Sequence, residues 1–180
     1  MKLLRRLSLV VGIIVLFFVI RTAFLDRDYS FSRSTVIAAP VNAVFPLLAD
    51  LENWQDWNPW LQTDPSIVLT FSDPAKGVGA FYLWSGEQSG SGKLIITKSG
   101  YLEELDYRIE FEGWEDLPSY GRFDLKAIDG SMTEITWTFE GSVGDGFFLR
   151  WLASMMETRV APFMEQGLEN LESEITETNS

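Results

Sequence analysis

The stretch FFLRWLASMMETRVAPFMEQGLENLESEI, residues 147–175, decides the fold of this chain. Its apolar positions recur at steps of three and four residues, which places them along one side of a helix: Leu149, Leu152, Met156, Val160, Phe163, Gly167, Leu171 and Ile175. A helix of that length extends over roughly 40 Å. The stripe therefore needs a broad apolar partner, and the only such surface that the preceding sequence offers is a β-sheet.

Two features of this helix also suit the wall of a cavity. Gly167 lets a strand or a ligand approach the backbone closely, and Met155, Met156 and Met164 carry unbranched side chains that adapt to irregular contents. Ordinary core packing, with the methionines as gap-fillers, is the simpler explanation of the same residues. Pro162 removes one helical hydrogen-bond donor, so a kink or break is expected near residues 158–161.

The sequence between residue 66 and this helix has the period of β-strands. Apolar and polar residues alternate in six runs, and Gly, Ser, Asp and Pro clusters separate most of them: Ile67/Leu69/Phe71, Tyr82/Trp84, Leu94/Ile96, Leu105/Tyr107/Ile109/Phe111, Phe123/Leu125/Ala127 and Ile135/Trp137/Phe139. Short turns between them predict an antiparallel meander with one dry and one wet face. Residues 29–38 predict an additional first strand. Charged residues that alternate with the apolar ones at 106–110 and 122–126 are expected to pair across strands on the wet face.

The run LENWQDWNPW, residues 51–60, is the most distinctive local feature. It follows a short helix that Pro40 begins, and Trp54, Trp57 and Trp60 recur every third residue. On a helical turn this spacing gathers the three indoles on one side, and Pro59 ends the element. The indoles either plug the end of the core or line the mouth of an apolar cavity, where each N–H could hold a polar group.

Composition excludes several classes of function. The chain has no cysteine and no histidine, which removes disulfides, thiolate nucleophiles, imidazole bases and His or Cys metal ligands. Its net charge of −12 and the concentration of basic residues in the first 28 positions leave a strongly acidic domain, which phosphate backbones repel. Nucleic acid is therefore not an expected partner, and no cofactor is expected.

The N-terminal segment predicts a membrane anchor. Residues 7–20 are apolar apart from Ser8 and Gly12, and Lys2, Arg5 and Arg6 precede them. Arg21 can snorkel, so the apolar segment extends to residue 25, and no small-residue cleavage site follows. We expect a single-pass signal anchor in the cell membrane over residues 1–25, with the domain on the extracytoplasmic side.

The order of these elements resembles the START-like SRPBCC superfamily, in the polyketide cyclase/dehydrase group. The residues that carry the resemblance are AAPVNAVFPLLADLENWQDWNPW at 38–60, Asp64-Pro65, GVGAFYLWSG at 77–86, Gly92, Glu104-Leu105, TWTFEG at 136–141 and MEQGLENLESEI at 164–175. The resemblance implies an α+β helix-grip fold: a curved antiparallel sheet wrapped around the long C-terminal helix. It covers residues 29–175, after a linker at 26–28 and before a polar tail at 176–180.

The resemblance also implies an apolar cavity between sheet and helix. Its expected ligand-binding residues are Trp54, Trp57, Trp60, Tyr82, Trp84, Tyr107, Phe123, Trp137, Met156, Val160, Phe163 and Met164. The leading hypothesis is a membrane-anchored protein that binds a hydrophobic small molecule or lipid. The alternatives are a cyclase or dehydrase that uses Tyr82, Tyr107 or an inward carboxylate as acid or base, and a structural or interaction domain without a ligand.

Overall fold

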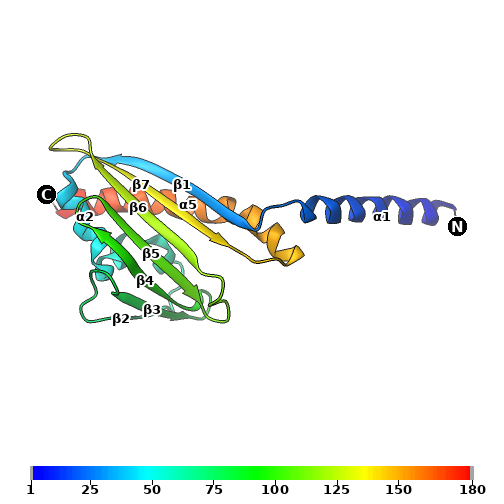
Figure 1. Cartoon of the computed structure of the whole chain (residues 1–180), viewed down its shortest axis with the longest axis horizontal. Coiled ribbons are helices and arrows are strands. Elements are labelled where there is room, and N and C mark those ends of the chain that lie inside the picture. Colours follow the sequence, from blue (N-terminus) through cyan, green and yellow to red (C-terminus); the bar gives the residue numbers. More distant parts are fainter. Residues whose placement is uncertain (1, 179–180) are drawn as a thin grey trace.

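The expected sheet is present as seven antiparallel strands in a computed structural model that describes residues 2–178 (Figure 1). Their spatial order is β1-β7-β6-β5-β4-β3-β2. The strands are β1 (Asp28–Ile37), β2 (Val68–Phe71), β3 (Phe81–Gly86), β4 (Gly90–Gly100), β5 (Glu104–Phe111), β6 (Ser119–Ala127) and β7 (Thr133–Ser142). β2 to β7 follow one another as a meander, and β1 pairs with β7 along its whole length, from Asp28 opposite Ser142 to Ile37 opposite Thr133.

The two faces of the sheet differ as the alternation predicts. Tyr107, Phe123 and Trp137 are buried on one face, while charged residues occupy the other. On that outer face Arg122 lies 2.6 Å from Glu104 and 3.8 Å from Asp106. These exposed ion pairs confirm the expected cross-strand pairing and contribute little to stability individually.

Four short helices cover one end of the buried face: α2 (Val41–Ala49), η1 (Leu51–Asn53), α3 (Trp54–Trp57) and α4 (Pro59–Gln62). Side chains cap two of them, because Asp50 accepts a hydrogen bond from the Glu52 N–H and Asn58 accepts one from the Trp60 N–H. Pro59 occupies the first turn of α4, where its missing N–H costs nothing. The run at residues 51–60 is therefore divided among η1, α3 and α4, with Trp54 and Trp57 in α3 and Trp60 in α4.

The C-terminal helix α5 (Phe147–Thr178) extends along the sheet beside β1 (Figure 1). It is uninterrupted at the exposed Pro162, so the expected break does not occur. Arg33 on β1 binds Glu157 at 3.2 Å and Glu165 at 2.6 Å, and so holds α5 on both sides of Pro162. The fully packed face of the helix overlaps the predicted stripe at Gly167, Leu171 and Ile175 and is otherwise shifted from it, with Ala153, Ala161, Met164 and Leu168 as its other members.

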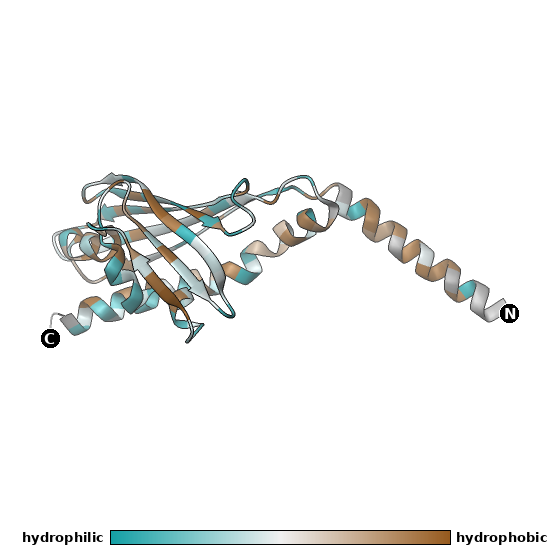
Figure 2. Cartoon of the chain, turned by 90° about the horizontal axis from the view of Figure 1, so that it is seen from below, coloured by the Kyte–Doolittle hydropathy of each residue, from teal (hydrophilic) through white to brown (hydrophobic). Residues whose placement is uncertain are grey.

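The N-terminal helix α1 (Lys2–Ala23) projects away from the sheet (Figure 1). The large apolar side chains that the structure describes between Leu7 and Ile20 are 42–67% exposed. Figure 2 colours much of this helix as hydrophobic. Among the residues that the structure describes in full, however, no helix is long and apolar enough to cross a bilayer. The expected transmembrane helix is therefore not found.

Candidate functional site

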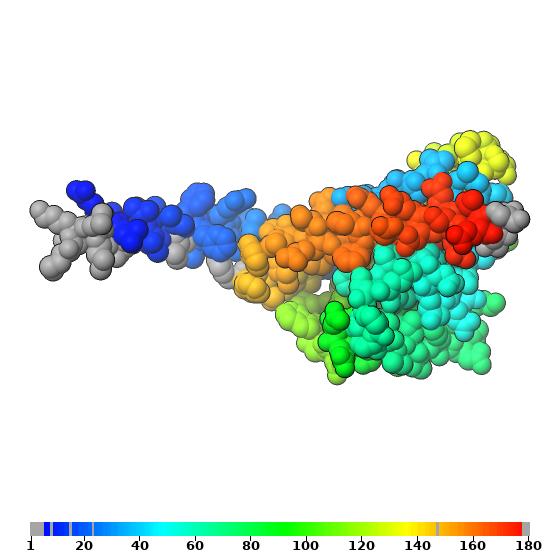
Figure 3. Space-filling model, turned by 180° about the vertical axis from the view of Figure 1, so that it is seen from behind, coloured from blue at the N-terminus to red at the C-terminus, as the bar shows by residue number. Residues whose placement is uncertain are grey.

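A cavity of about 110 Å³ lies between the buried face of the sheet and the first half of α5. Buried residues form its inner wall: Trp54, Leu61, Tyr82, Trp84, Leu94, Tyr107, Trp137, Phe139 and Met164. Less buried residues surround its open side: Trp60, Ile109, Phe111, Met156, Val160 and Phe163. Figure 3 shows the surface hollowed below the first half of α5, which is orange.

Most of the predicted ligand-binding residues surround this cavity, and two do not. Trp54, Trp60, Tyr82, Trp84, Tyr107, Trp137, Met156, Val160, Phe163 and Met164 all line it. Trp57 and Phe123 are fully buried outside the lining, with their ring centroids 6.1 Å apart. They fill the core beneath the cavity and do not contribute to its wall, in contrast to the expectation from the sequence.

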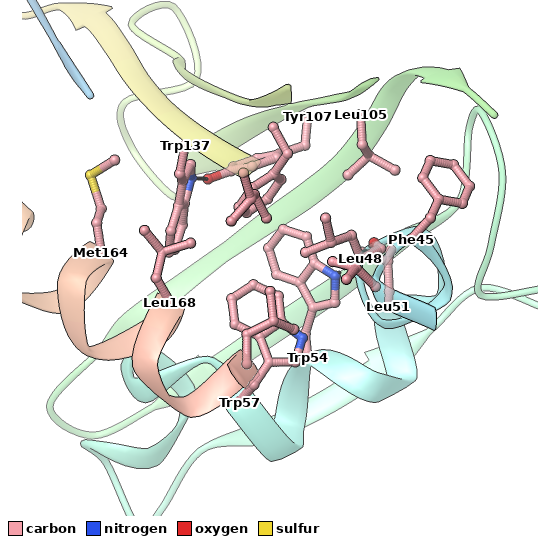
Figure 4. Packing of buried hydrophobic residues seen from close by; sticks show 14 of the residues in the cluster. Phe45, Leu48, Leu51, Trp54, Trp57, Leu105, Tyr107, Trp137, Met164 and Leu168 are labelled. Atoms are coloured by element: carbon pink, nitrogen blue, oxygen red, sulfur yellow. Dashed lines mark hydrogen bonds between the residues drawn. The ribbon is translucent and has the colours of Figure 1, made fainter. Parts of the chain in front are cut away.

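The three tryptophans of the 51–60 run have different roles. Trp54 donates its indole N–H to the Leu48 carbonyl at 2.9 Å, and Trp57 donates to the Leu47 carbonyl at 3.1 Å. These two donors hold α3 against α2 and are not available to a ligand, which corrects the expectation from the sequence (Figure 4). Trp60 is 39% exposed and packs edge-on against Phe163 at a centroid distance of 5.0 Å, so it closes part of the rim between α4 and α5.

Neutral hydroxyl, indole and amide groups supply the polarity of the cavity wall. Trp137 donates its Nε1 proton to the Tyr107 hydroxyl at 2.8 Å, which leaves the hydroxyl proton of Tyr107 without an acceptor in residues 2–178 (Figure 4). Tyr82 also lines the cavity, and its hydroxyl has no hydrogen-bond partner in that range. The indole Nε1 of Trp84 is a third donor, buried and unpartnered among the described residues.

Burial keeps both tyrosines protonated. Removal from water raises the pKa of Tyr82 far above its usual value, and the neighbouring Tyr107 raises it further. Burial likewise raises the pKa of Tyr107, and the hydrogen bond from Trp137 offsets part of that shift. Both hydroxyls are therefore hydrogen-bond donors or acids at neutral pH, and neither is available as a tyrosinate base.

Charged side chains are missing from the lining that the structure describes. No Asp, Glu, Lys or Arg contributes to the cavity wall, so the inward carboxylate considered as a catalytic acid or base is not found there. Across the described part of the chain, no group of three acidic side chains is arranged to hold a metal ion. The arrangement suits an uncharged molecule, because an unpaired charge would be costly in this lining.

Seven further residues line the cavity: Asn58, Leu61, Leu94, Ile109, Phe111, Ser119 and Phe139. The alternation of apolar and polar residues could have identified some of these lining residues. Leu94 lies on the same face of its strand as Ile96, and Phe139 on the same face as Trp137. Asn58 and Ser119 carried no such signal. Asn58 is positioned by the start of α4, and Ser119 by its hydrogen bond to the Tyr29 hydroxyl at 2.7 Å.

Comparison with known protein families gives one match that covers most of the chain. A family model described as "Polyketide cyclase / dehydrase and lipid transport" matches residues 28–176, which include every strand and nearly all of α5. No curated protein matches the sequence.

Solved structures with similar folds come from distant proteins. One is norcoclaurine synthase from Thalictrum flavum, in complex with dopamine and hydroxybenzaldehyde, with a TM-score of 0.65 and 12% sequence identity. The alignment covers 89% of this chain and 94% of the synthase chain. The Zhui aromatase/cyclase from Streptomyces sp. R1128 has a TM-score of 0.63 at 14% identity, covering 85% and 96%. A protein from Arthrobacter aurescens has a TM-score of 0.58 at 19% identity, covering 82% and 86%. At these identities the likeness concerns the fold alone.

Proposed function

The chain belongs to the polyketide cyclase / dehydrase and lipid transport family of START-like proteins, and from that premise we propose that its cavity binds an uncharged hydrophobic small molecule or a segment of a lipid. The observation that carries the proposal is the apolar cavity of about 110 Å³ at the junction of sheet and α5. A cavity of about 150 Å³ in another protein binds benzene, so the present space fits one ring or a short alkyl segment.

The expected affinity follows from the area that such a ligand buries. A molecule that loses roughly 200 Å² of apolar surface gains about 5 kcal/mol, before ordering costs are subtracted. That gain corresponds to a dissociation constant on the order of 0.1–1 mM. A hydrogen-bond acceptor on the ligand would improve the affinity if it reached the free donors of Tyr82, Tyr107 or Trp84. Larger ligands would require the rim formed by Trp60 and Phe163 to separate.

A probe panel tests the binding proposal. We expect the purified full-length chain to bind 4-fluorotoluene, a one-ring probe. It should also bind 1-naphthol, whose hydroxyl oxygen can accept a hydrogen bond and whose second ring requires the rim of Trp60 and Phe163 to separate. The variant Val160→Trp fills the rim and should abolish binding of both probes, observed by ¹⁹F NMR and by fluorescence titration. Val36→Trp is the matched control, because Val36 is 47% exposed and lies outside the cavity lining. Failure of both probes to bind would contradict the proposal.

A second candidate function is acid-assisted cyclisation or dehydration, which the free hydroxyl proton of Tyr107 favours. A buried, protonated tyrosine can donate to a carbonyl oxygen as negative charge develops there. In this case Tyr107→Phe should retain binding of a linear polyketone probe and lose its cyclisation, followed by mass spectrometry of the products. No turnover by the natural chain would leave binding as its activity.

We also propose that residues 7–25 attach the protein to a membrane, with the domain on the extracytoplasmic side. The support is the exposed apolar surface of α1, since a soluble protein rarely leaves so many large apolar residues in water. The full-length chain should float with phosphatidylcholine vesicles, and the variant Ile13→Glu/Leu16→Glu should not. A chain that remains entirely with the aqueous fraction would contradict membrane attachment. Protease protection in intact cells would test the side.

A further inference from the structure

The apolar stripe of α5 continues out of the cavity and onto the surface. Met156 and Val160 line the cavity, and Leu152 and Phe148 precede Met156 at steps of four residues. Leu152 is 37% exposed and Phe148 is 65% exposed. Because residues four apart lie on the same side of a helix, these side chains form one apolar strip that leads from solvent to the ligand space.

The exposed end of this strip is held beside the end of α1. The Arg150 side chain donates to the Leu25 carbonyl at 3.2 Å, and the backbone N–H of Val143 donates to the Arg27 carbonyl at 3.0 Å. Figure 1 shows the first turns of α5 and the end of α1 at the same end of the sheet. A membrane that accepts α1 would therefore lie close to the exposed part of the strip.

Aromatic residues at this end have the character of a membrane interface. The rings of Phe148 and Trp151 are in contact, with centroids 5.4 Å apart, and Trp114 in the β5–β6 loop is 50% exposed. The same loop reaches the start of α5, since Leu117 approaches Gly144. Tryptophan favours the boundary between lipid and water because its ring is apolar and its N–H is polar.

The charged side chains near the exposed end of α5 indicate which kind of lipid surface could bind there. Asp145, next to the strip, pairs with Arg27 at 3.0 Å and with Arg150 at 3.4 Å, so its charge is largely balanced. Glu115 and Asp116 remain close by in the β5–β6 loop, and the chain as a whole is acidic. An anionic bilayer would repel this end, whereas a neutral phospholipid surface would not.

We propose that Phe148, Trp151 and Leu152, here named the entry strip, contact the neutral bilayer that holds α1, and that apolar ligands pass along it from lipid into the cavity. The proposal rests on the proposed function, because it requires both the attachment of α1 and a cavity that accepts a ligand. It assigns the exposed end of α5 a role that core packing does not explain.

Site-specific labelling tests the contact directly, because the chain contains no cysteine. Full-length variants with a single cysteine at Phe148, Leu152 or Ile13 are labelled with NBD. Ser154→Cys and Thr158→Cys are labelled as controls, because these exposed positions of α5 do not follow the four-residue spacing of Phe148, Leu152 and Met156. With phosphatidylcholine vesicles, NBD emission should rise several-fold and shift to the blue at positions 148, 152 and 13. It should stay unchanged at positions 154 and 158, and added phosphatidylserine should reduce the effect at 148.

The labelling outcomes separate the two proposals. A response at position 13 without one at 148 or 152 would overturn the entry strip and leave membrane attachment intact. A response at none of the positions would overturn both. Equal responses at 148 and 154 would indicate general insertion of α5 and would also overturn the strip.

A transfer experiment tests entry. Vesicles loaded with 1-naphthol are mixed with the full-length chain in a stopped-flow instrument, and quenching of tryptophan fluorescence reports uptake. Phe148→Asp/Leu152→Asp should slow uptake at least about tenfold, equivalent to about 1.4 kcal/mol in the barrier. The control Ser154→Asp/Thr158→Asp should not slow it, and neither variant should change the affinity for 1-naphthol added from solution. Equal uptake rates in both variants would overturn entry along the strip.

Discussion

Three aromatic rings of the inner sheet face each lie over a glycine directly opposite in the neighbouring strand. In each pair a methyl group added to the glycine would overlap the ring: Trp84 over Gly92, Tyr107 over Gly121 and Tyr29 over Gly141. Glycine leaves the space in which a large ring lies flat against the backbone, and this pairing is known to stabilise strands that contain glycine. Two of these rings, Trp84 and Tyr107, belong to the cavity wall, so the glycines help to shape it.

Gly121→Ala should therefore be disruptive although the change adds only one methyl group. The methyl would displace the buried Tyr107 ring and its hydrogen bond with Trp137, and overpacking of this kind costs about 1–3 kcal/mol. Gly130→Ala is the matched control, because nothing lies within 4 Å of its added methyl group. Urea denaturation should show a loss of stability for the first variant only. Equal stabilities would mean that the ring moves freely.

Asp64 is the most heavily hydrogen-bonded carboxylate of the described chain. It accepts hydrogen bonds from the backbone N–H groups of Ser66, Gln88 and Ser89 and from the hydroxyls of Ser66 and Ser89, at 2.6–3.0 Å. These bonds connect the segment before β2 to the turn between β3 and β4. The Ser66 hydroxyl and the backbone of Ser89 are the main causes that hold the pKa of Asp64 far below its usual value.

The lowered pKa of Asp64 predicts a pH-dependent contribution to stability. Because the folded pKa lies below the unfolded value of about 3.9, the contribution is fully present above that value and is lost as the pH falls toward the folded pKa. Asp64→Asn should lower the melting temperature by several degrees at pH 7. The difference from the natural chain should shrink below about pH 4, measured by thermal unfolding across pH. A difference that is constant from pH 7 to pH 2 would contradict this role.

At the scale of elements, α5 meets the sheet and α4 at Gly167, as the sequence predicted for a close approach. A methyl group added there would lie 3.0 Å from the Trp137 ring and 3.3 Å from Pro59. Arg33 holds the middle of the helix to β1 through two glutamates. The second half of α5 is thus packed tightly, and the first half spans the cavity.

A substitution of Gly167 has two opposite effects on stability: it raises the helix propensity of this position and it crowds the contact with Trp137 and Pro59. Alanine gains about 1 kcal/mol of helix propensity and crowds Trp137 slightly, so Gly167→Ala should change the free energy of unfolding by less than about 1 kcal/mol. Gly167→Leu has no room and should cost at least about 2 kcal/mol. Urea denaturation of both variants measures the difference. A stable Gly167→Leu variant would show that α5 can move away from the sheet.

The elements could be predicted from periodicity, whereas their exact contacts could not. Alternation placed Tyr82, Tyr107 and Trp137 on the inner face, and the structure confirms this. The three-residue spacing of Trp54, Trp57 and Trp60 predicted that their indoles share one side of a single helical element. That prediction fails for Trp60, because Asn58 and Pro59 begin a new helix. Lining residues such as Ser119, and the glycines beneath the rings, depend on strand register, which period alone does not define.

At the scale of the whole molecule, the fold combines a tightly packed core with the unfilled cavity described above. Trp54, Trp57 and Phe123 fill the space under α2 and α3 with edge-to-face ring contacts, while the space under the first half of α5 stays open. At about 24 cal/mol per Å³, a void of about 110 Å³ costs about 3 kcal/mol. In a purely structural domain, an unfilled cavity would lower stability without any benefit. The cavity therefore favours ligand binding over the interaction-domain alternative.

Filling the void should therefore stabilise the protein and remove its binding function. Val160→Phe places a larger side chain at the rim of the cavity and should raise the free energy of unfolding by about 1 kcal/mol, a fraction of the cost of the void. In the natural chain, 1-naphthol at saturating concentration should raise the melting temperature, because it binds only the folded state. In Val160→Phe that ligand-dependent increase should disappear, while Val36→Phe, on the exposed side of β1, should retain it with unchanged stability. A Val160→Phe variant that is less stable and still responds to 1-naphthol would show that the void is not the binding site, since the added ring would then have found no space there.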